Sequence, residues 1–158
     1  MAQDGMFKKG YRGFVKGENS LRHILLLIIR LYWGSLLVMT GLGKWMNIQG
    51  VTEYFSSLHI PYPQVAAYCA ATVELLGGIS LFLGFFSRIF SLLLSILFIT
   101  AYSTAHKEAF TNLQSFPSQF IMQDPFLYLY AALIILCFGP GIFSIDYWLE
   151  KRSYGEAL

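Results

Sequence analysis

Four apolar segments of membrane-spanning length limit the folds that this sequence can adopt. A helix that crosses a bilayer needs about 20 mostly apolar residues, and such segments lie at residues 21–43, 64–86, 88–105 and 124–143. The last one contains the triplet Gly139-Pro140-Gly141, which we expect to break or end its helix. The sequence therefore predicts an all-α fold, an integral membrane bundle of four helices.

The composition agrees with a chain that is surrounded by lipid. Hydrophobic residues make up 56% of the 158 residues and charged residues only 13%, about half of the 25% found in soluble domains. A soluble helical protein would need a polar face on each helix, and residues 88–105 and 124–143 show none. The net charge of +2, without a long basic run, also argues against a nucleic-acid partner.

Lys and Arg are distributed unevenly between the two sides of the predicted membrane. Eight of these residues lie in the N-terminal segment, at the connection between the second and third spans (Arg88) and in the C-terminal tail. Two, Lys44 and Lys107, lie in the connections on the other side. The positive-inside rule then places both termini in the cytoplasm. We expect an N-terminal cytoplasmic arm at residues 1–20, a four-helix domain at 21–149 and a cytoplasmic tail at 150–158. The apolar spacing within residues 44–63 predicts a short interfacial helix.

Two charges lie inside the predicted spans, Arg30 in the first and Glu74 in the second. A lone charge at mid-bilayer costs roughly 3 kcal/mol or more, and counting from the span ends puts both at similar depth. This predicts a buried Arg30–Glu74 ion pair, helped by Tyr32, Thr40 or a water. The pair either locks the two spans in register, or it forms a functional site in which Glu74 exchanges protons or a polar headgroup such as a quinone ring binds.

Other residues have simpler expected roles. Arg88 follows the second span at the interface, where it can contact lipid phosphate or the end of a helix dipole. Asp146 suits the first turn of a short interfacial helix. Small residues allow close helix packing, which we expect at Gly34, Gly41, Gly77 and Gly78.

The sequence supports no autonomous enzyme. Its two cysteines, Cys69 and Cys137, lie in apolar runs where burial is expected, and they form no CxxC motif. No His or Cys neighbours have metal-ligand spacing, and there is no nucleophile–base arrangement or Gly-rich phosphate loop. We therefore expect no metal site and no intrinsic cofactor.

Several motifs together resemble those of one family. Gly41-Leu42-Gly43-Lys44 follows Arg30, and Glu74-Leu75-Leu76-Gly77-Gly78 comes later. The run from Leu81 to Arg88 resembles an LxLGxxTR motif, and the run from Gly139 to Asp146 resembles GPGxxSxD. Over residues 22–148 the chain resembles the DoxX family of small four-helix membrane proteins, whose typical charged positions correspond to Arg30, Glu74 and Arg88.

The resemblance implies a bacterial inner-membrane protein with other protein subunits as partners. The family takes its name from a small subunit of a quinone-linked thiosulfate oxidoreductase, and other members are linked to thiol and oxidative-stress complexes. It therefore implies an accessory subunit of a redox complex, with a quinone bound at a partner interface. Two alternatives stay open, namely a structural or homo-oligomeric subunit without chemistry and a small proton-linked transporter or lipid-handling protein that uses Glu74.

Overall fold

Helices form almost all of the regular structure. The computed structural model describes the backbone of residues 2–155 and the side chains of residues 20–153. The helices are α1 (Ala2–Met46), α2 (Ile48–Ser57), α3 (Pro63–Leu83), α4 (Ser87–Thr104), α5 (Lys107–Thr111), α6 (Pro117–Ile121), α7 (Asp124–Phe138) and α8 (Ile145–Gly155). The described backbone contains no strand, which confirms the all-α prediction.

Three helical segments of the described chain are long and apolar enough to cross a membrane. They are Ser20–Met46, Pro63–Leu83 and Ser87–Thr104, and they match the first three predicted spans closely. The fourth apolar helix, α7, has only 15 residues. It reaches about 22 Å, which is less than the hydrocarbon thickness of about 30 Å.

Helix α7 ends at Phe138, and not at residue 143, because the following residues cannot continue it. Gly139 and Gly141 adopt positive φ values of 75° and 82°, a conformation that favours glycine. Pro140 has no N–H to donate. The predicted interruption at this triplet is confirmed, and residues 139–144 lead to α8 as irregular backbone.

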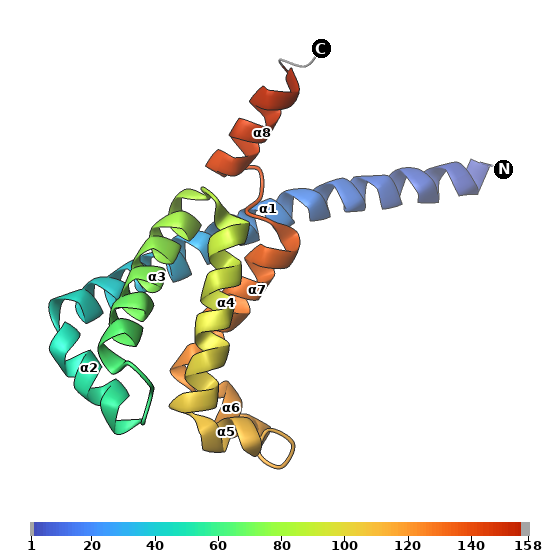
Figure 1. The fold of residues 1–158 in the computed structure, drawn as a ribbon. Helices are drawn as coiled ribbons and strands as arrows, with labels where there is room; N and C mark the ends of the chain where they lie inside the picture. The colour runs from blue at the N-terminus through green and yellow to red at the C-terminus, as the bar shows by residue number, and fades with distance from the viewer. Residues whose placement is uncertain (1, 156–158) are drawn as a thin grey trace.

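The spanning helices pack as two pairs, α1 with α3 and α4 with α7. Figure 1 shows α3 and α4 diverging from the short turn that joins them. A buried apolar cluster that includes Leu37, Leu81, Leu94 and Ile135 connects the pairs. The short helix expected within residues 44–63 is α2, which lies against α3.

The predicted terminal segments continue the neighbouring helices. Residues 2–20, predicted as an arm, extend α1 in the backbone (Figure 1), and the side chains up to residue 19 lie outside the described part. The predicted tail belongs to α8 as far as Gly155, and residues 156–158 lie outside the described part.

The α1–α3 contact brings two backbones together at glycines. A Cβ atom on Gly41 would lie 2.6 Å from the Leu75 backbone nitrogen, and one on Gly78 would lie 2.6 Å from that of Val38. Gly34 is equally confined, with the Phe82 nitrogen 2.8 Å from its hypothetical Cβ. These contacts determine the register of the first two spans, because a larger residue would have to separate the helices.

Gly41→Ala should destabilise the protein, whereas Gly43→Ala should not. A Cβ on Gly43 meets nothing within 4 Å, so the second change is a matched control on the same helix. Overpacking at Gly41 should cost about 1–3 kcal/mol, measured as a lower unfolding temperature of the detergent-solubilised protein. Equal unfolding temperatures for the two variants would contradict the close approach.

Candidate functional site

Arg30 lies inside the bundle and binds only backbone carbonyls. It is 1% exposed. Its Nε donates to Leu81 O at 2.9 Å, and Nη2 donates to Phe82 O at 3.2 Å. Nη1 donates to Pro140 O at 2.9 Å and to Phe143 O at 3.1 Å. One guanidinium therefore serves two segments, the C-terminal end of α3 and the irregular backbone after α7.

These acceptors are carbonyls that the helices leave unpaired. The last carbonyls of a helix have no intrahelical donor, and the break at Gly139 removes the donors for others. Arg30 is almost fully buried among them, and a buried polar group without a partner costs free energy. Gly84, with a φ of 72°, also makes room, because a Cβ there would lie 2.2 Å from Arg30 Nη2.

Asp146 connects the start of α8 to the turn between α3 and α4, at the same end of the bundle. Its two carboxylate oxygens accept from the backbone N–H groups of Phe86, at 2.8 Å, and Ser87, at 2.9 Å. Its own N–H donates to Gly84 O at 2.9 Å. Asp146 lies in the first turn of α8 as predicted, but its carboxylate caps α4, where a negative charge is favourable.

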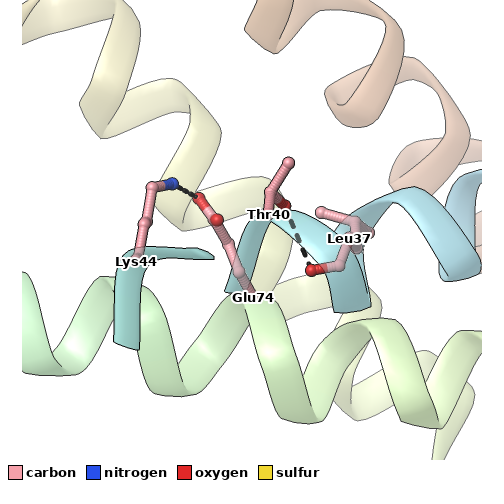
Figure 2. A network of polar contacts seen from close by, with 4 residues as sticks. All are labelled: Leu37, Thr40, Lys44 and Glu74. Carbon is pink, nitrogen blue, oxygen red and sulfur yellow. Dashed lines mark hydrogen bonds and ion pairs between the residues drawn. The ribbon is translucent and has the colours of Figure 1, made fainter. Parts of the chain in front are cut away.

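Glu74 pairs with Lys44, as Figure 2 shows. Lys44 Nζ donates to Glu74 Oε1. Glu74 is 4% exposed, while the Lys44 side chain is 32% exposed. Glu74 Oε2 is buried and has no hydrogen-bond partner. Thr40, also drawn in Figure 2, donates to Leu37 O at 3.0 Å and not to Glu74.

The predicted Arg30–Glu74 ion pair is therefore wrong. The prediction measured depth from the ends of the apolar runs, but the glycine contacts determine the real register. Gly34 lies against Phe82 and Gly41 against Leu75, so Arg30 reaches the end of α3 and Glu74 lies near Lys44. Lys44 follows the first apolar run and was therefore expected in a loop, not as a partner of Glu74. The spacing of the glycines on α1 and α3 is the sequence signal that could have led to the correct Lys44–Glu74 pair.

A large cavity opens beside the Lys44–Glu74 pair. It has a volume of about 1350 Å³ and lies between the diverging pairs, with walls from α1, α2, α3, α4 and α7. Its lining is mostly apolar, and both Lys44 and Glu74 take part in it. Glu74 Oε2 is thus a buried, unpartnered acceptor on a residue that lines an apolar chamber.

One wall of the cavity consists of aromatic rings. Tyr128 stacks on Phe98, with centroids 5.5 Å apart and planes at 15°. Trp33 meets Tyr128 edge to face at 5.6 Å. All three residues line the cavity. Aromatic rings pack against one another in offset-stacked or edge-to-face arrangements, so this part of the lining can accept another planar ring.

The remaining predicted residues lie elsewhere. Gly77 faces α4, where a Cβ would lie 2.8 Å from Leu94 Cδ1. Arg88 is exposed at the start of α4. Cys69 and Cys137 are free thiols and exposed, contrary to the predicted burial. Among the described residues, no group of three or more His, Cys, Asp or Glu could hold a metal ion.

The comparisons with known proteins agree with this architecture. The DoxX family model matches residues 25–107. The chain belongs to the DoxX family. The match includes Arg30, Lys44 and Glu74, and it ends before the Gly139–Asp146 motif.

Two relatives of this DoxX chain are informative. It is 30% identical over 126 residues to "Inner membrane protein YphA" of Escherichia coli (strain K12), covering 79% of this chain and 90% of the relative. It is 30% identical over 83 residues to "Putative oxidoreductase CatD" of Bacillus subtilis (strain 168), covering 52% of this chain and 60% of the relative. No solved structure matches it significantly.

Replacing Arg30 by Lys should destabilise this DoxX protein strongly. An ammonium group cannot reproduce the planar fork that reaches four carbonyls, and each lost hydrogen bond to a charged donor costs about 1.5–3 kcal/mol. We expect a loss of about 3 kcal/mol or more in the free energy of unfolding, measured by SDS titration in mixed micelles. Arg22→Lys, at an exposed position of the same helix, should have little effect; similar losses would argue against the carbonyl network.

Mutation of Lys44 should lower the free energy of unfolding more than mutation of Glu74. Lys44→Met leaves a buried, unpaired carboxylate, which costs about 3 kcal/mol. Glu74→Gln leaves a partly exposed ammonium that can reach water, and should cost less than about 1 kcal/mol. The double variant, Lys44→Met with Glu74→Gln, should recover most of the stability that Lys44→Met alone loses. Equal effects of the two single variants in the same SDS titration would contradict the burial of Glu74.

Proposed function

We propose that this DoxX chain is an accessory membrane subunit of a bacterial inner-membrane redox complex and binds an isoprenoid quinone in its cavity. The observation that carries the proposal is the cavity itself, a mostly apolar chamber of about 1350 Å³ with the Lys44–Glu74 ion pair in its wall. The names of the two relatives, "Inner membrane protein YphA" and "Putative oxidoreductase CatD", support the membrane location and the reaction class of this proposal.

The shape and lining of the cavity suit a planar headgroup with a prenyl tail. Pockets of about 300–1000 Å³ enclose drug-sized ligands, so this one has room for a ring and several prenyl units. The ring can lie against Trp33 and Tyr128, while the tail extends along apolar lining residues such as Leu93 and Ile96. Ile96 and Leu127 line the cavity and are also exposed, so they connect its apolar lining with the lipid-facing surface.

The free Glu74 oxygen gives the site a preference for the reduced ligand. An ionised carboxylate only accepts hydrogen bonds, and Oε2 has no donor within the described structure. A quinol hydroxyl supplies that donor, whereas a quinone carbonyl would face a second acceptor. In this proposal Glu74 Oε2 binds the quinol hydroxyl, and Lys44 holds the carboxylate in place from the other side.

A partner supplies the electron-transferring cofactor in this proposal. The sequence carries no CxxC or nucleotide-binding motif, so the chain contributes the anchor and the quinol site. We also propose that both termini face the cytoplasm, on the uneven distribution of Lys and Arg. The cavity, which begins near Trp33 on α1 and extends to α2, then lies in the outer half of the membrane.

Purification in mild detergent, followed by extraction of quinones and identification of bound proteins, tests the proposal. The native chain should carry quinol in near-stoichiometric amount together with an oxidoreductase subunit. Glu74→Gln should lower the bound quinol about tenfold, since one charge-assisted hydrogen bond is lost. Glu53→Gln, which removes an exposed carboxylate of α2 outside the cavity lining, should change nothing.

Each other outcome points to a different role. A preparation with phospholipid but no quinone would favour the lipid-handling alternative. A lone or self-associated chain with an empty cavity would favour the structural alternative. Equal quinol in the Glu74→Gln and native proteins would remove Glu74 from the binding site.

A further inference from the structure

A second pocket lies at the opposite end of the bundle from the cavity. It has a volume of about 470 Å³ and is formed by the first residues of the α1 span, the start of α4, the turn after α7 and the start of α8. The cavity meets α1 from Trp33 onward, whereas this pocket meets it at Arg22 and His23. The two sites are therefore about 15 Å apart along α1.

The pocket presents basic groups without partners. Neither Arg22 nor Arg88 makes a hydrogen bond or ion pair among the described residues. Arg88 lies over the turn, with Nη2 3.1 Å from the place of a Cβ on Gly139. His23 Nδ1 is buried and unpartnered, 3.5 Å from the place of a Cβ on Gly141. The missing side chains of Gly139 and Gly141 leave room for Arg88 and His23 at the turn, and Arg22 lines the same pocket.

The acidic residues of the pocket play different parts. Asp146 already accepts two backbone N–H bonds at the start of α4, so its charge is balanced by that helix end. Glu150 is exposed and lines the pocket. What remains is a pair of free guanidinium groups with one carboxylate beside them, an arrangement that complements a zwitterion better than a dianion.

The position of the pocket matches the headgroup layer. Arg22 comes at the start of the apolar α1 span, and Arg88 comes at the start of α4. Long basic side chains at such positions reach the polar interface. Exposed apolar side chains adjoin the pocket from α4, α7 and the turn, namely Ile89, Phe138 and Ile142, and give acyl chains a surface to follow.

We propose that this pocket binds one phospholipid through its headgroup, with a preference for phosphatidylethanolamine. Arg22 and Arg88 hold the phosphate diester as two charge-assisted donors. Glu150 accepts from the ethanolamine ammonium. The acyl chains lie along the ends of α4 and α7. This site is separate from the quinol cavity and does not depend on its occupant.

Native mass spectrometry of the full chain, delipidated in detergent and titrated with phosphatidylethanolamine, tests this site. The native protein should bind one lipid tightly, and Arg88→Gln and Arg22→Gln should each weaken binding about tenfold, since each removes a charge-assisted contact. Lys151→Gln removes the same charge from α8 outside the pocket lining, and should bind like the native protein.

Two further arms separate the sources of the phosphate. Glu150→Gln should weaken binding of phosphatidylethanolamine but not of phosphatidylglycerol, which has no ammonium group. Millimolar inorganic phosphate should not displace the bound lipid. Displacement by inorganic phosphate, or equal weakening by Lys151→Gln and Arg88→Gln, would overturn the proposal. So would native-like binding in both arginine variants once they are shown to elute as folded protein.

Discussion

The guanidinium of Arg30 holds together chain segments that are far apart in the sequence. It joins the middle of α1 to the last carbonyls of α3 and to two carbonyls beyond the end of α7. The helices themselves supply no donor for these carbonyls at their ends. The interruption of the fourth span at Gly139 is therefore tolerated because an arginine from the first span satisfies the backbone that it exposes.

The two ends of the bundle differ in how tightly they are held. At the end near α8, the Arg30 hydrogen bonds and the Asp146 cap connect α1, α3, α4 and the segment after α7. At the other end, α3 and α4 diverge and leave the cavity with the Lys44–Glu74 pair. The hydrogen-bonded end positions the helices, and the open end provides space that an apolar ligand can fill.

Local patterns in the sequence were enough to predict the helical class, the first three spans, the break at Gly139 and the family. They were not enough to pair the charges. Glu74 and Arg30 looked like partners because depth was counted from the ends of apolar runs, while the contacts of Gly34 and Gly41 shift α1 relative to α3. The cap that Asp146 forms on α4 spans 60 residues, and no local pattern signals such a contact.

The large sequence separation between Arg30 and two of its acceptors also determines when this end of the bundle can close during synthesis. Its acceptors Pro140 and Phe143 follow it by 110 and 113 residues, so the first span enters the membrane long before these partners exist. A chain that ends after α4 would contain three spans, and Arg30 would have only the carbonyls of Leu81 and Phe82 as acceptors. Closure of this end of the bundle is thus a late event in the synthesis of the chain.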